Sequence, residues 1–181
     1  MSEEKKENFY VDDDLEATTE FLQGLTEKII DATRNVDNHA NVMVGINTGI
    51  LMLAISEIFQ VDHLKITFGV VAIFSAVSVF VALCAIRLPK FLVNKKHEES
   101  LFYARRIAKF SSADEYSQQL RKILSNDDAF FKEYSLEVYN LSRYYYIPKR
   151  RLLSWSRYIF VFGVMASALF LLLEKLHWFN Y

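Results

Sequence analysis

The sequence predicts an all-α membrane protein with three transmembrane helices, an N-terminal amphipathic helix, and a helical cytoplasmic domain between the second and third spans. Apolar residues make up 52% of the 181 residues and aromatic residues 15%, which is high for a chain solvated only by water. These residues gather in long runs, and glycine and alternating apolar patterns are nearly absent between the second and third runs. Helices are therefore expected throughout, and strands are not.

The N-terminal region divides into a leader and a helix. Residues 1–13 are acidic and have too little apolar surface to order themselves, so a flexible leader is expected there. Residues 14–39 form the expected amphipathic helix, and no proline separates them from the first span. Apolar or small residues recur in this helix at heptad spacing, at Leu15, Thr18, Leu22, Leu25, Ile29, Ala32 and Val36.

Three segments are long and apolar enough to cross about 30 Å of hydrocarbon. Residues 66–88 contain no charge before Arg87 and give the clearest span. Residues 155–175 include an uncharged run, which Trp155 and Trp178 bracket as interfacial aromatics. Residues 40–58 form the remaining span, although polar residues such as Asn47 interrupt it.

The charge distribution predicts the orientation. Residues 1–39 hold eleven Asp or Glu against four Lys or Arg, a net charge of −7. The segment 87–157 holds fifteen Lys or Arg against eight Asp or Glu, a net charge of +7, with basic clusters at both membrane edges. By the positive-inside rule this segment is cytoplasmic, so the N-terminus is expected inside and the C-terminus outside.

Residues 89–150 are the expected cytoplasmic helical domain. The helix of the second span is expected to continue to Phe110, before a break at Ser111 and Ser112. Ser112 with Glu115 reads as a capping box, and Asn126 can cap the following helix. That helix carries an apolar side, which Pro148 is expected to end or kink; the side comprises Phe130, Tyr134, Val138, Leu141 and Tyr145.

Signatures of catalysis and metal binding are absent from the sequence. His97 lacks the second histidine of a metalloprotease helix, no phosphate-binding glycine loop occurs, and Cys84 is the single cysteine. We therefore expect no enzymatic activity, no catalytic residue, no metal and no cofactor.

Two groups of residues are candidates for function. The basic residues admit two interpretations, ordinary anchoring at anionic membrane lipids or an anionic ligand, and the ligand candidates are Arg105, Arg106, Lys109, Arg143, Tyr144, Tyr146 and Lys149. Small residues four apart serve either packing within the monomer or a homo-oligomer. Candidates for packing or pore lining are Gly45, Asn47, Gly49 and Gly163, and the pairs Ser78 with Ala82 and Gly163 with Ser167 have the same spacing.

Several short motifs together resemble the Pycsar transmembrane effector family. Residues 36–51 match its first-span signature at Asp37, Ala40, Gly45 and Asn47, whereas His39 stands where the family usually has lysine. The stretches Leu101-Phe-Tyr, Asp114-Glu-Tyr, Glu137-Val-Tyr-Asn-Leu-Ser and Lys149-Arg-Arg-Leu-Leu also agree in order and spacing, so the resemblance covers about residues 30–170.

This resemblance implies an antiphage effector that acts with a nucleotide cyclase. Such effectors respond to cyclic CMP or cyclic UMP and impair the bacterial inner membrane, so that the infected cell dies. No separate nucleotide-binding domain is visible, so direct sensing would fall to the cytoplasmic helices. The alternative is a constitutive membrane scaffold that holds a partner protein without responding to any ligand.

Overall fold

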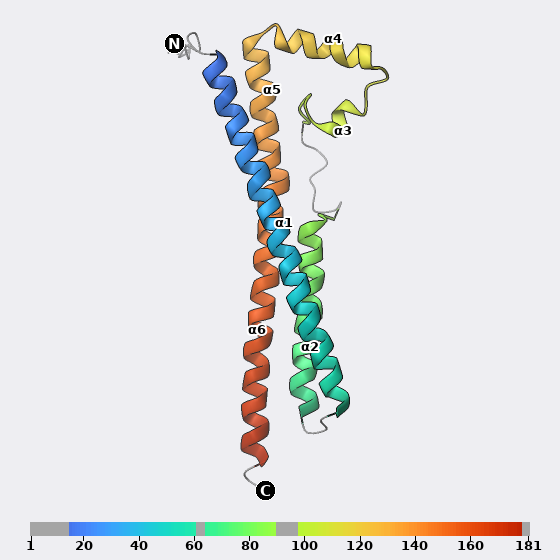
Figure 1. Cartoon of the computed structure of the whole chain (residues 1–181), viewed down its shortest axis with the longest axis vertical. Coiled ribbons are helices and arrows are strands. Elements are labelled where there is room, and N and C mark those ends of the chain that lie inside the picture. Colours follow the sequence, from blue (N-terminus) through green and yellow to red (C-terminus); the bar gives the residue numbers. More distant parts are fainter. Residues whose placement is uncertain (1–14, 61–63, 90–97, 179–181) are drawn as a thin grey trace, which may run out of the picture. The chain divides into compact units, whose positions relative to one another are not determined.

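The protein is helical throughout the part of the chain that its structure describes. The structure, a computed structural model, describes residues 15–60, 64–89 and 98–178 (Figure 1). The predicted leader at residues 1–13 lies outside these residues. The elements are α1 (Leu15–Gln60), α2 (Lys65–Ile86), α3 (Ala104–Ile107), α4 (Ala113–Leu124), α5 (Asp127–Asn140), the π-helix η2 (Leu141–Tyr146) and α6 (Ile147–Trp178).

The predicted fold class is confirmed. Three helical segments are long and apolar enough to span a membrane, namely Ala17–Gln60, Lys65–Ile86 and Asp127–Glu174, and the described residues include no strand. The chain divides into two compact units. Unit 1 comprises Met1–Ile29 and Glu98–Leu141, and unit 2 comprises Ile30–His97 and Ser142–Tyr181.

Helix α1 is one uninterrupted helix of 46 residues, so the predicted amphipathic segment 14–39 and the predicted span 40–58 belong to the same element. At about 1.5 Å per residue, a helix of this length extends about 69 Å. Because a bilayer core is only about 30 Å thick, much of α1 must lie outside the hydrocarbon.

Unit 2 has small residues inside and large apolar residues outside. α2 packs along α6, and its buried residues are Thr67, Ser75, Ser78, Ala82 and Ala85, which recur at helical spacing on one face. Bulky side chains such as Ile73, Phe80 and Met165 are 64% to 67% exposed. This arrangement suits lipid, because small residues let helix backbones approach closely while lipid solvates the large side chains.

The predicted continuation of the second span to Phe110 is wrong. α2 ends at Ile86, Arg87 has an extended backbone, and Pro89 follows two residues later. A proline lacks an N–H and disfavours helical geometry in the residue before it, which explains the early end. Residues 98–103 are not helical, and the next helix, α3, has only four residues.

The predicted N-caps of the next two helices are confirmed. The Ser112 hydroxyl accepts from the Glu115 N–H at 3.1 Å, and the Asn126 side chain accepts from the Ala129 N–H at 3.1 Å. The Glu115 carboxylate reaches back to the N–H and hydroxyl of Ser111 rather than to Ser112. These hydrogen bonds from Ser111 lower the pKa of Glu115, since they stabilise its charged form.

Pro148 does not end the helix that precedes the third span. The π-helix η2 follows α5 directly, and α6 follows η2, so helical structure is continuous from Asp127 to Trp178. In an α-helix the ring of Pro148 would conflict with the carbonyl four residues earlier, at Tyr144. The wider π turn lies over this position and accommodates the proline within the helix.

Candidate functional site

A buried polar cluster joins the three membrane-spanning helices of unit 2. It consists of Asn47 on α1, Ser78 on α2 and Ser156 on α6, all of which are fully buried. The Asn47 amide nitrogen donates to the Ser78 hydroxyl at 2.6 Å, and this hydroxyl donates to the Ser156 carbonyl at 2.8 Å. The Ser156 hydroxyl in turn donates to the Ser78 carbonyl at 2.9 Å. Three helices are thus joined through two hydroxyls and one amide.

The cluster is incompletely satisfied. The side-chain oxygen of Asn47 is buried and has no hydrogen-bond partner among the described residues. A buried polar atom without a partner costs about 1–3 kcal/mol. The packing that surrounds Asn47 therefore carries a free-energy penalty that another arrangement of the helices, or an entering water molecule, would relieve.

The predicted small residues behave differently on different helices. At Gly163 a built Cβ atom would lie 2.3 Å from the Phe74 Cβ atom, so this glycine permits the close approach of α2 and α6. Ser78 and Ala82 are both fully buried, as expected of small residues at an interface. Cβ atoms built at Gly45 and Gly49, by contrast, meet nothing within 4 Å.

Three of the predicted ligand residues contact one acidic residue, Glu99, in unit 1. Lys109 lies 2.6 Å from the Glu99 carboxylate and Arg105 lies 3.8 Å from it. Arg106 donates to the Glu99 backbone carbonyl and lies 3.9 Å from the Glu133 carboxylate. The structure therefore brings Arg105, Arg106 and Lys109 together, with their charge opposed by acidic groups.

An acidic face of α5 binds the segment that carries these cations. The Glu133 carboxylate accepts from the Leu101 N–H at 2.8 Å, and Glu137 accepts from the Ser100 hydroxyl. One turn further, Asn140 donates to the Glu98 carbonyl at 2.9 Å. This face was not predicted, although the polar residues at positions 133, 137 and 140 have the spacing of one helix side.

The other predicted ligand residues belong to unit 2. Lys149 pairs with Asp37, with its amine 2.6 and 2.8 Å from the two carboxylate oxygens. Tyr146 packs against a core that includes Val36, Ala40 and Leu153, so much of its ring serves packing.

Arg143 and Tyr144 complete the predicted set. Arg143 is exposed in η2 and has no ion-pair partner within the described ranges. Tyr144, also in η2, is partly buried and makes an interaction of its own. Unit 2 therefore contributes one exposed cation, one cation paired with Asp37 and two partly buried tyrosines to the predicted set.

The fold and the polar cluster define an α-helical membrane protein that spans the bilayer three times. Within residues 15–60, 64–89 and 98–178, no group of three or more His, Cys, Asp or Glu residues could hold a metal ion. A family model described as the Pycsar effector protein domain matches residues 21–174, and the chain belongs to this family. No curated protein and no solved structure matches the chain.

Membership in this family supports a role as an antiphage effector located in a membrane. The family consists of membrane effectors and is not known for an enzymatic activity. It also implies a cyclic nucleotide signal and a cyclase partner.

Proposed function

We propose that this chain is an abortive-infection effector that impairs the bacterial inner membrane when it binds a cyclic pyrimidine nucleotide, cyclic CMP or cyclic UMP, made by a partner cyclase. The polar cluster of Asn47, Ser78 and Ser156 carries this proposal, because it joins all three spans through three buried side chains and leaves one oxygen unpaired. A free energy of a few kcal/mol is enough to shift helices packed in this way to another arrangement. A ligand that binds one of the two arrangements more tightly than the other can supply this free energy.

The nucleotide phosphate is proposed to bind the cations around Glu99. Arg105 and Lys109 are already arranged about one carboxylate, and a phosphate would compete with that carboxylate for them. If phosphate displaced the Glu99 carboxylate from these cations, the neighbouring segment, which Glu133 and Glu137 hold on α5 through Leu101 and Ser100, would loosen. Nucleotide binding would thereby change the structure within unit 1. Arg143, Tyr144, Tyr146 and Lys149 remain predicted ligand residues of unit 2.

Arg105→Ala and Arg106→Ala are each expected to weaken nucleotide binding about ten- to a hundredfold, because a charge-assisted hydrogen bond is worth roughly 1.5–3 kcal/mol. Calorimetry on the full chain in detergent, with cyclic CMP, cyclic UMP and cyclic AMP, measures this. Arg105→Ala should weaken binding less than Arg106→Ala, because the Arg105 side chain is 63% exposed and its ion pair with Glu99 is long, at 3.8 Å. Arg121→Ala, which removes an exposed arginine of α4, is the matched control.

The same proteins in vesicles loaded with a fluorescent dye test the effector function itself. The wild-type chain should release dye on addition of the pyrimidine nucleotide, and a variant that no longer binds should not. Binding without release would indicate a sensor that acts through another partner. Absence of both would favour the constitutive scaffold and refute the proposal.

The proposed orientation places the N-terminus and the Arg87–Arg157 segment in the cytoplasm and the C-terminus in the periplasm. In a Cys84→Ala background, a cysteine at exposed Ser125 should therefore be protected from an impermeant thiol reagent in intact cells. A cysteine at Gln60, the exposed last residue of α1, should be labelled under the same conditions. The reverse pattern would overturn the orientation.

The chain is further proposed to act as a homo-oligomer. Gly45 and Gly49 lie on α1 with open space beside them, so within the monomer they do not serve the close packing that such glycines permit. A second copy of the chain is the proposed neighbour for this part of α1.

A further inference from the structure

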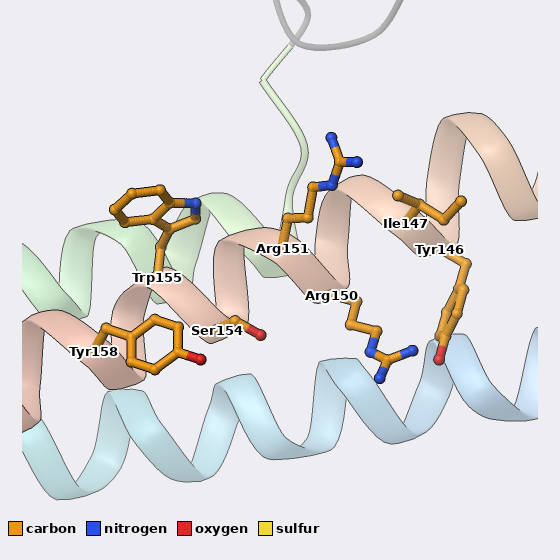
Figure 2. Close-up of a pocket in the computed structure, with 7 residues that line it drawn as sticks. All are labelled: Tyr146, Ile147, Arg150, Arg151, Ser154, Trp155 and Tyr158. Atoms are coloured by element: carbon orange, nitrogen blue, oxygen red, sulfur yellow. The ribbon is translucent and has the colours of Figure 1, made fainter.

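A cavity of about 310 Å³ lies against α6 near the start of its uncharged run (Figure 2). Figure 2 shows its lining residues from the end of η2 along successive turns of α6, with the guanidinium group of Arg150 on the side of α1 and that of Arg151 on the opposite side of the helix. The lining residues are Tyr146, Ile147, Arg150, Arg151, Ser154, Trp155 and Tyr158.

The two arginines of this cavity are available for a ligand. Both are exposed, and within residues 15–60, 64–89 and 98–178 neither has an ion-pair or hydrogen-bond partner. Lys149, the residue before them, is by contrast held by Asp37. The donors that line the cavity include the two unpaired guanidiniums and the hydroxyls of Ser154 and Tyr158, and such groups bind phosphate oxygens.

The surroundings of the cavity resemble a membrane interface. Trp155 is 63% exposed and Tyr158 71% exposed, and such amphipathic rings are enriched at the level of lipid headgroups. From Tyr158 the same side of α6 continues through Phe162 and Met165, which are also more than 60% exposed. Tyr158, Phe162 and Met165 thus form an apolar track that continues along α6 from the hydrogen-bond donors of the cavity. This arrangement matches a phosphate group attached to acyl chains.

We propose that the cavity lined by Arg150, Arg151, Trp155 and Tyr158 binds the phosphate of an anionic phospholipid, whose acyl chains lie along the apolar side of α6. A free phosphate would satisfy the same donors but would leave the apolar track unused. The site is separate from the cations around Glu99, which belong to unit 1, so this lipid site goes beyond the proposed nucleotide response.

The fluorescence of Trp155 can measure lipid binding to the cavity. In the full chain with Trp178→Phe, Trp155 is the single tryptophan, and brominated lipids quench its fluorescence on contact. We expect brominated phosphatidylglycerol, diluted into phosphatidylcholine vesicles, to quench Trp155 more strongly than brominated phosphatidylcholine at the same fraction. Equal quenching by the two lipids would mean that only ordinary surrounding lipid contacts this face, and would overturn the proposal.

Arginine variants test the assignment of the site. Arg150→Gln and Arg151→Gln are each expected to lower the preference for phosphatidylglycerol about fivefold, since one basic residue near an anionic surface contributes roughly that factor. Arg157→Gln, an exposed arginine of the same helix outside the cavity, should keep the preference. An equal loss in Arg157→Gln would assign the effect to general surface charge and refute the cavity.

Competition separates the two sources of phosphate. Millimolar inorganic phosphate or cyclic CMP should leave the excess quenching by brominated phosphatidylglycerol unchanged, because neither has acyl chains for the apolar track. Loss of the excess quenching with either compound would assign the cavity to a free phosphate and overturn the lipid proposal.

Discussion

Gly163→Ala is expected to destabilise the packing of α2 against α6 by about 1–3 kcal/mol or more, the range for an overpacked interior site. The added methyl group would lie 2.3 Å from the Cβ and 2.7 Å from the Cγ of Phe74. Because the Phe74 Cβ is fixed to the backbone, the ring cannot simply rotate away, and the two helices must move apart. Thermal unfolding of the purified chain in detergent measures this loss.

Gly69→Ala provides the matched control on α2. A Cβ atom at this position meets nothing within 4 Å, so the substitution adds no contact. It should be neutral or stabilise the helix by up to about 1 kcal/mol, because alanine has the higher helix propensity. Equal unfolding temperatures for both variants would show that α2 and α6 do not approach each other at Gly163 as the structure has them.

Ser78→Ala is expected to have the second large effect, because the Ser78 hydroxyl is the centre of the polar cluster. Its loss removes the acceptor of the Asn47 amide and the donor to the Ser156 carbonyl, and it leaves both polar atoms of the Asn47 side chain buried without a partner. Leaving such groups unpaired costs about 1–3 kcal/mol, although measured hydrogen bonds between membrane helices average only about 0.6 kcal/mol. Unfolding in detergent gives the free-energy difference.

A double-mutant cycle with Asn47→Leu separates the hydrogen bond from packing. When both polar partners are replaced, no unpaired amide remains, so the double variant should be more stable than Ser78→Ala alone. Asn47→Leu should also change toxicity on triggering more than Asn41→Leu, since Asn41 is exposed on the same helix. If the changes in unfolding free energy of the two single variants simply added up in the double variant, the hydrogen bond between Asn47 on α1 and Ser78 on α2 would not couple these helices.

Much of the fold follows from local signals in the sequence. Ser112 and Asn126 could be recognised as caps because each needs only its own side chain and a backbone N–H three residues later. The three spans follow from length and apolar composition, which need no knowledge of neighbouring helices. The end of α2 at Ile86 is also encoded locally, by Pro89, although the apolar register after the span favours a longer helix.

The candidate sites were less predictable because they depend on contacts between distant residues. Asn47 could be selected by its depth in the first span, yet its partner Ser78 lies 31 residues away and was expected only as a small packing residue. The cations at positions 105, 106 and 109 were identified by charge, whereas the opposing role of Glu99 depends on the turn before α3. The absence of an ion-pair partner for Arg150 and Arg151 could likewise be recognised only from the positions of all the described residues around them.

The π-helix before Pro148 has a consequence for the register of α6. Its wider turn holds about one residue more than an α-helical turn, so the extra residue behaves as a local defect in an otherwise regular helix. Each residue of an α-helix corresponds to a rotation of about 100°. If the six residues Leu141–Tyr146 returned to α-helical bonding, the side chains after them would turn by about that angle relative to those before them. A change confined to one helical turn would thus alter the rotational register between the residues of α5 and those of α6, which carries the third span.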